Sequence, residues 1–169
     1  MPFQRGAIEI SVLGGTSLPV SALHAKPDQS LTLVSLHVGR VMSGGPTGNN
    51  FELLFDASPF VHVEQGAGVN GWSLSPLFLR WNFPPMGSQG PRIFSEGSAG
   101  MLFTSRPESV QGPTFRFIEQ AGFGVRIEQT PSLALLAGYR FQHISNAGLS
   151  RPNRGGNFNL VYGGVSFLR

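Results

Sequence analysis

The chain alternates apolar and polar residues one by one in eight long runs, each followed by turn-forming residues. A period of two is that of a β-strand, whose successive side chains point to opposite faces. No stretch carries a competing period of 3.6 residues, which would indicate an amphipathic helix. The pattern therefore predicts eight strands, over residues 7–18, 29–42, 51–65, 71–83, 92–105, 114–129, 132–145 and 157–168.

The length of these runs indicates a barrel. They span roughly 12 to 16 residues, whereas strands in soluble sandwiches are typically about five or six residues long. Long strands in even number, joined by turns, are typical of membrane barrels. A chain of 169 residues has the size of one domain. We therefore expect a single domain over residues 1–169.

Composition favours a barrel whose apolar face lies outside. Only 12% of the residues are charged, about half the usual share of roughly 25%. No run reaches the 18 or so consecutive apolar residues that a transmembrane helix needs, so spanning by a helix is excluded and spanning by a barrel stays open. In a membrane barrel the apolar face meets lipid and the polar face lines the interior.

The polar faces of the runs carry charges of both signs, which could neutralise one another inside a narrow lumen. In the run 51–65, for example, Glu52, Asp56 and His62 share one face, opposite Phe55 and Val61. The charged residues expected inside are Glu9, Arg40, Glu52, Asp56, Arg80, Glu96, Arg116, Arg126, Glu128 and Arg140. The sequence predicts an all-β fold, an eight-stranded antiparallel transmembrane up-and-down β-barrel. A soluble lipocalin-like barrel is the alternative, with its charges outside.

Several function classes receive no support. The chain has no cysteine, which removes disulfides and thiolate metal sites. The net charge of +3 is spread over isolated arginines, so nucleic-acid binding is not expected. His24, His37 and His62 lack the spacing of metal ligands, and we expect neither metal nor cofactor. The N-terminus lacks a signal-peptide pattern, so we expect a mature or trimmed form if the protein is exported.

The stretch "HISNAGLSRPNRGGN" holds the candidate chemistry, at the end of the seventh run. His143 and Ser145 are two residues apart, so on a strand they share a face, the one that Tyr139 and Phe141 occupy. With both termini at the periplasmic end, this stretch lies at the outer rim. A histidine beside a serine can remove the hydroxyl proton as the oxygen attacks an acyl carbonyl. The alternative is two polar residues at a membrane interface.

The same stretch resembles the motif of the lipid A 3-O-deacylases of the PagL type, eight-stranded outer-membrane barrels that hydrolyse an ester-linked acyl chain of lipopolysaccharide. The resemblance covers the last two strands and their loop. It implies that Ser145 is the nucleophile, His143 the general base and Asn153 a donor to the oxyanion hole. Arg151 and Arg154 of the same loop are candidates for binding lipid A phosphates.

One position departs from that family, because Asn157 stands where its triad has a glutamate. An amide can accept a hydrogen bond from the imidazole but carries no charge. In a serine protease the acid-to-amide change costs about 10⁴-fold, through the wrong histidine tautomer. If the runs 114–129 and 132–145 form a hairpin, Glu119 comes to lie beside His143 and is a candidate surrogate acid. The alternative for Glu119 is an inward ion pair with an arginine.

The resemblance implies an outer-membrane serine esterase that removes the 3-O acyl chain of lipid A, a carboxylic ester hydrolase with an atypical third residue. Its partners would be lipid A and lipopolysaccharide of the outer leaflet and the membrane itself, with no nucleic acid; a homodimer stays open. The rival function is a non-catalytic small outer-membrane barrel, a structural or adhesion module that has lost the triad acid.

Overall fold

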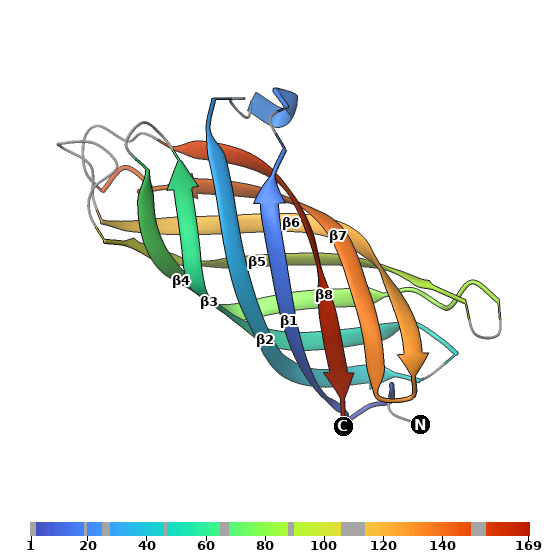
Figure 1. Ribbon diagram of the computed structural model, residues 1–169. Helices are drawn as coiled ribbons and strands as arrows, with labels where there is room; N and C mark the ends of the chain where they lie inside the picture. The colour runs from blue at the N-terminus through green and yellow to red at the C-terminus, as the bar shows by residue number, and fades with distance from the viewer. Residues whose placement is uncertain are drawn as a thin grey trace.

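Eight antiparallel strands close into one barrel in the computed structural model (Figure 1). The structure describes residues 3–18, 20–24, 28–45, 47–64, 68–87, 90–105, 114–149 and 155–169. The strands are β1 (Ile8–Ser17), β2 (Ser30–Gly44), β3 (Asn50–Glu64), β4 (Val69–Asn82), β5 (Arg92–Thr104), β6 (Phe115–Thr130), β7 (Leu133–Ser145) and β8 (Gly156–Leu168). The expected strands are confirmed, because each observed strand end lies within two residues of the predicted one. Each strand pairs with the next, and β1 closes the barrel against β8.

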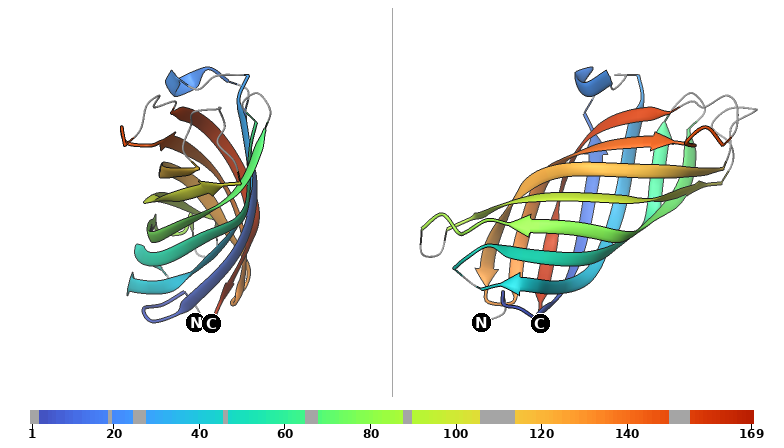
Figure 2. Two further views of the ribbon diagram at one scale, coloured as in Figure 1. Left: turned by 90° about the vertical axis from the view of Figure 1, so that its left-hand side faces the viewer. Right: turned by 180° about the vertical axis from the view of Figure 1, so that it is seen from behind.

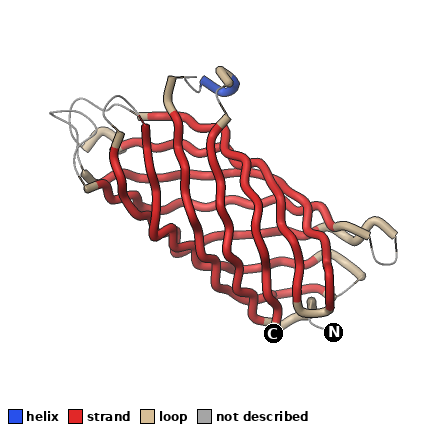
Figure 3. The backbone as a smooth tube through the Cα atoms, in the orientation of Figure 1, coloured by secondary structure: helices blue, strands red, loops and turns tan. Residues whose placement is uncertain are grey.

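A short 3-10 turn, η1 (Ala22–His24), follows β1. It stands at the end of the barrel opposite the two termini, while strand covers almost the whole wall (Figure 3). The strands of the front and back walls cross steeply (Figure 2), as the strand tilt of a closed barrel requires. Among the described residues, no helix is long and apolar enough to cross a membrane.

The apolar face points outward, as the sequence predicts. On β1, Ile8, Ile10 and Val12 are each about half exposed, whereas the alternate residues Glu9 and Ser11 are completely buried. On β6, Arg116, Gln120 and Arg126 are buried inside, whereas Phe123, Val125 and Ile127 are exposed outside. A wall of exposed aliphatic and aromatic side chains around buried charges is the arrangement of a membrane barrel.

The middle of the lumen holds a network of buried ion pairs. Arg80 contacts Glu9 at 2.7 Å, and Glu52 and Glu96 at 3.3 Å each. Arg126 also contacts Glu9 at 2.7 Å, and Arg140 contacts Glu96 at 2.8 Å. Each of these buried charges therefore has a partner of opposite sign, which offsets much of the free-energy cost of removing it from water.

Two of the charges expected inside lie elsewhere. Arg40 is exposed, with its Nε donating to the carbonyl of Gly6 at 3.2 Å, and Glu128 is exposed near the hairpin that joins β6 to β7. Both belong to the barrel end that holds the termini, where the side chains reach the rim. A strict two-residue alternation assigns both side chains to the lumen. At the rim, however, a side chain on the inner face can turn out of the barrel end, because no wall lies in its way.

A β-bulge changes which residues of β3 face inward. The pairing of β3 with β4 shifts register between Ser58 and Val61, and a one-residue shift sends every following side chain to the opposite face. Val61 and Val63 are therefore buried inside, and His62 turns outward. The prediction that His62 shares the inner face with Glu52 is wrong for this reason.

The bulge contributes to an apolar plug that fills the lumen at the end opposite the termini. The plug consists of Leu31, Leu33, Val61, Val63, Val69, Leu102, Ile118, Ile144, Phe158 and Leu160. Its members come from seven strands, so it ties the rim of the barrel together on the inside. Ile144 belongs to the plug and lies between His143 and Ser145 in sequence. The plug therefore fixes the end of β7 that carries these two residues.

Candidate active site

His143 and Ser145 lie on the outer wall of the barrel, near the end of β7 opposite the termini. The flanking residues Gln142 and Ile144 are buried inside, whereas His143 and Ser145 are half-buried. Because alternate residues of a strand point to the same side, both side chains face outward. The structure places them where the sequence expects them, on the lipid-facing side close to the rim.

Two polar residues flank His143 across the sheet, one on each neighbouring strand. Glu119 of β6 is its Cα partner on one side, and Asn157 of β8 is its partner on the other. The predicted hairpin register, which brings Glu119 beside His143, is confirmed. Glu119 is exposed and therefore does not form the inward ion pair that was its alternative.

The imidazole of His143 is held by Asn157. His143 Nδ1 lies 2.6 Å from Asn157 Oδ1, a short hydrogen bond. Asn157 in turn donates from Nδ2 to the backbone carbonyl of Leu23 at 3.0 Å. Within the described part of the chain, His143 Nε2 has no hydrogen-bond partner, so this nitrogen is available to a neighbouring hydroxyl or to substrate.

Ser145 ends β7 at a tight turn. Its Oγ accepts a hydrogen bond from the backbone N–H of Ala147 at 3.4 Å, and Asn146 Oδ1 accepts one from Gly148 N at 2.9 Å. Ala147 has a φ of 51°, a left-handed conformation that is uncommon outside glycine and often occurs at functional sites. Among the described residues, no hydrogen bond joins Ser145 to His143; in enzymes without substrate such catalytic bonds are often long and tighten in the complex.

Gly155 lies close to both His143 and Ser145. A Cβ placed on Gly155 would lie 3.6 Å from His143 Cε1 and 3.6 Å from Ser145 Cβ. The same Cβ would lie only 2.9 Å from the backbone oxygen of Ile144, so glycine is the residue that fits this close approach to the pair.

A strip of aromatic side chains runs along the outer wall toward Ser145. Trp72 of β4 stacks on Phe103 of β5, with ring centroids 4.3 Å apart and planes at 17°. Phe115 lies 5.3 Å from Phe103 and 5.1 Å from Phe117, and both Phe115 and Phe117 are on β6. Phe117 is the Cα partner of Ser145. The strip gives a continuous apolar surface that ends beside the hydroxyl.

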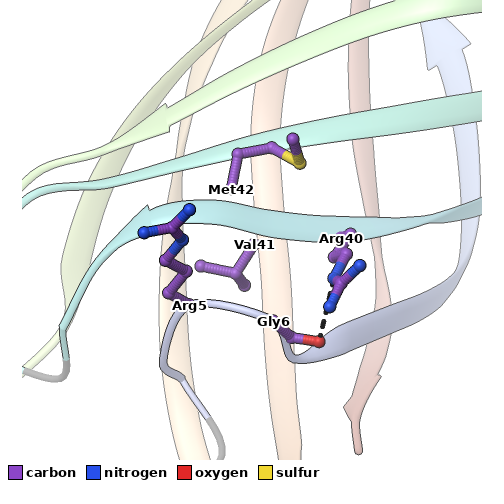
Figure 4. A pocket seen from close by; sticks show the side chains of 5 residues that line it. All are labelled: Arg5, Gly6, Arg40, Val41 and Met42. Atoms are coloured by element: carbon purple, nitrogen blue, oxygen red, sulfur yellow. Dashed lines mark hydrogen bonds between the residues drawn. The ribbon is translucent and has the colours of Figure 1, made fainter.

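The remaining sequence-predicted residues are Arg151, Asn153 and Arg154, and all three lie outside the described residues. The expected roles in binding phosphate and in the oxyanion hole thus stay predictions. A shallow depression at the other end of the barrel is lined by Arg5, Gly6, Arg40, Val41 and Met42 (Figure 4). It lies on the side of the termini, away from His143 and Ser145.

Sequence reasoning missed the contacts made by Tyr139, Asn159 and the segment around η1. Tyr139 donates its hydroxyl hydrogen to Asn159 Oδ1 at 2.5 Å. Asn159 donates from Nδ2 to the carbonyls of Ala22 at 2.9 Å and Val20 at 3.4 Å. The sequence does hold a signal for these contacts: Asn159 falls on the outward face of a membrane strand, where an asparagine requires a polar partner.

Comparisons with protein-family profiles and with solved structures point to the same family. The profile of the lipid A 3-O-deacylase (PagL) family matches residues 21–166. No match was found among curated protein sequences. The crystal structure of the outer membrane enzyme PagL is similar, with a TM-score of 0.62 and 19% identity over 96% of this chain and 97% of that chain.

Two other barrels share the fold. The N-terminal β-barrel domain of Pseudomonas aeruginosa OprF has a TM-score of 0.58 and 16% identity, covering 98% of both chains. The outer membrane protein OprG from Pseudomonas aeruginosa has a TM-score of 0.56 and 12% identity, covering 98% of this chain and 97% of that chain. At these sequence identities the structural similarity shows the fold alone. The match to the family profile is what assigns the chain to one family among barrels of this shape. The chain therefore belongs to the lipid A 3-O-deacylase (PagL) family of outer-membrane hydrolases, whose substrate is lipid A.

Proposed function

We propose that this protein removes the 3-O acyl chain of lipid A with Ser145 as nucleophile, His143 as general base and Asn157 in the place of the acid. The observation that carries the proposal is the 2.6 Å contact between His143 Nδ1 and Asn157 Oδ1, on the same outward face as Ser145. Because Nδ1 is hydrogen-bonded to Asn157, Nε2 is the ring nitrogen left to take the proton of Ser145. The arrangement reproduces the roles of a Ser-His-acid triad with an amide as third member.

The reaction proceeds in two halves. Ser145 Oγ attacks the ester carbonyl carbon while its proton moves to His143 Nε2, which forms a tetrahedral oxyanion. The intermediate collapses by breaking the bond to the sugar oxygen, which takes the proton from His143. Water then attacks the acyl-Ser145 ester with His143 again as base, and the fatty acid leaves as Ser145 recovers its proton. The reaction thus consumes one water per ester cleaved.

The outward orientation implies that the substrate approaches laterally within the outer leaflet. An acyl chain lying along the wall would contact Phe117 and the aromatic strip, so that its ester reaches Ser145 without the lipid leaving the membrane. Arg151 and Arg154 would bind the lipid A phosphates as bidentate donors. Asn153 would donate to the oxyanion; losing one such donor typically costs roughly 3 to 4 kcal/mol of transition-state stabilisation.

Glu119 would support the imidazolium from the other side. It is the cross-strand neighbour of His143, and opposite charges at such positions are worth roughly 0.2 to 1 kcal/mol. Glu119→Gln should therefore lower kcat by no more than about fivefold. A loss of about 100-fold or more would instead identify Glu119 as the acid of the triad and remove that role from Asn157.

The test is mass spectrometry of lipid A after incubation with the detergent-refolded protein, beside the Ser145→Ala variant. Loss of one hydroxyacyl chain with the parent and not with the variant supports the proposal. Intact lipid A with both would favour the rival, a non-catalytic barrel that keeps the family's fold. Replacing Arg151 and Arg154 together by Gln should weaken substrate affinity, and unchanged affinity would exclude their phosphate role.

A further inference from the structure

The segment between β1 and β2 is tied to the outer face of β8 by two asparagines. Asn157 Nδ2 donates to the carbonyl of Leu23, and Asn159 Nδ2 donates to the carbonyls of Val20 and Ala22. These asparagines are two residues apart, so both amides face outward from the same strand. The backbone around η1 thus lies against the wall beside His143.

We propose that the carbonyl of Leu23 sets the tautomer of His143 by orienting the Asn157 amide, and that Tyr139 and Asn159 are positioning residues that hold this carbonyl in place. The inference rests on the proposed function, because the tautomer matters for a histidine that acts as a base. It assigns a role to a segment outside the triad and to two residues that do not touch the reacting atoms.

The amide of Asn157 can face His143 with either of its two ends. A carboxylate offers only acceptors to an imidazole, whereas an asparagine has an acceptor end and a donor end. If the NH₂ end of Asn157 faced His143, Nδ1 would have to accept, and the ring proton would lie on Nε2. A ring protonated at Nε2 cannot remove the proton of Ser145, which is how the acid-to-amide change inactivates a serine protease.

The carbonyl of Leu23 resolves this ambiguity because a carbonyl can only accept. At 3.0 Å it requires the NH₂ end of Asn157, so Oδ1 must face His143. Nδ1 must then carry the hydrogen of the 2.6 Å bond, and Nε2 presents its lone pair. One backbone oxygen thus determines which ring nitrogen is the base.

The position of that oxygen is itself fixed. Leu23 has a φ of 53°, a left-handed conformation that persists only where surrounding contacts hold it. Asn159, which is only 1% exposed, supplies such contacts through its hydrogen bonds to the carbonyls of the preceding residues Val20 and Ala22. Its own amide is oriented by Tyr139, whose hydroxyl donates to Oδ1, so the NH₂ end is left for the carbonyls of Val20 and Ala22.

The first test is ¹⁵N NMR of ¹⁵N-histidine-labelled protein in micelles, with the His143 signals assigned by their loss in His143→Gln. The parent should show a protonated Nδ1 and a bare Nε2 in the neutral ring. A parent with the proton on Nε2 would overturn the inference. This readout needs no turnover, so it decides the inference even if the parent leaves lipid A intact and the proposed function fails.

The second test is a double-mutant cycle on kcat. Asn159→Leu should lower kcat about tenfold or more and shift His143 toward the Nε2-protonated ring, and Tyr139→Phe should do the same to a smaller extent. In an Asn157→Asp background, where there is no amide to orient, Asn159→Leu should change kcat by less than about twofold. Thr16→Val, at the base of the same β1–β2 connection, is the matched control and should leave kcat and tautomer unchanged.

The cycle separates positioning from general stability. Folding of each variant is followed by the heat-dependent gel shift of a closed barrel, and kcat is expressed per folded molecule. Equal losses from Asn159→Leu in the parent and in the Asn157→Asp background would show a merely structural effect and overturn the proposal. An unchanged tautomer in folded Asn159→Leu would overturn it as well.

Discussion

Replacing Asn157 by Asp keeps the side-chain shape and restores a charge beside His143. In a serine protease, the reverse change costs about 10⁴-fold because the amide stabilises the wrong tautomer. Here Nδ1 already has an acceptor at 2.6 Å, so Asp would only convert a neutral hydrogen bond into a charge-assisted one. Neutral bonds contribute about 1 kcal/mol and charged ones about 1.5 to 3 kcal/mol, a difference worth roughly 2- to 30-fold in rate.

An opposing effect places the expected gain in the lower part of that range. Asp has no Nδ2 hydrogens, so the 3.0 Å bond to the carbonyl of Leu23 is lost, and a carboxylate oxygen then faces the carbonyl oxygen. We therefore expect Asn157→Asp to raise kcat by about tenfold or less. Asn157→Leu removes both hydrogen bonds and leaves the tautomer unset, so kcat should fall by about 100-fold or more.

The assay is acyl-chain release from lipid A in mixed micelles under single-turnover conditions, with Ser145→Ala as the blank. Single-turnover rates exclude product release, which can otherwise limit kcat. A gain of about 1,000-fold or more in Asn157→Asp would refute the reasoning, because it would show that the native amide holds His143 in the wrong tautomer. No loss in Asn157→Leu would show that position 157 does not orient the base.

Three further substitutions test the space beside the pair, the aromatic strip and the lumen. Gly155→Ala puts a methyl group 2.9 Å from the backbone oxygen of Ile144 and 3.6 Å from both His143 Cε1 and Ser145 Cβ; the forced shift beside the pair should lower kcat/KM on lipid A about tenfold or more. Gly163→Ala, on the outer face of β8, meets its nearest atom at 3.6 Å and should not. Phe117→Ala should raise KM several-fold by removing apolar contact with the acyl chain, while Phe60→Ala, an exposed aromatic on β3, should leave KM unchanged. Arg80→Met leaves three buried carboxylates short of a partner and should lower the free energy of unfolding in urea by about 3 to 5 kcal/mol, with activity per folded molecule retained; an unfolding midpoint equal to that of the parent would contradict this.

The pairing of β6 with β7 shows how far sequence alone reaches. A two-residue period and a tight turn are local features, and together they fix which residues lie opposite one another in a hairpin. For this reason the sequence predicts that Glu119 lies beside His143, and the structure has that register. The same period placed His143 and Ser145 on the outer wall.

The limits of the period appear on β3. Its bulge between Ser58 and Val61 turns His62 outward and adds Val61 and Val63 to the apolar plug. A bulge depends on how two strands pair, so its position is not fixed by the alternation within either strand. The sequence therefore predicted the polar lumen at mid-height and missed its apolar end.

The barrel, its outward apolar face and the strand that carries the candidate nucleophile can all be predicted from the amino-acid sequence, because each follows from side-chain alternation between neighbours in the chain. The orientation of the Asn157 amide, in contrast, follows from the three-dimensional fold alone. That orientation depends on the carbonyl of Leu23, 134 positions away in sequence, which barrel closure between β1 and β8 brings to the same wall. A backbone carbonyl has no residue identity, so no reading of side-chain types could have assigned it a part in the site.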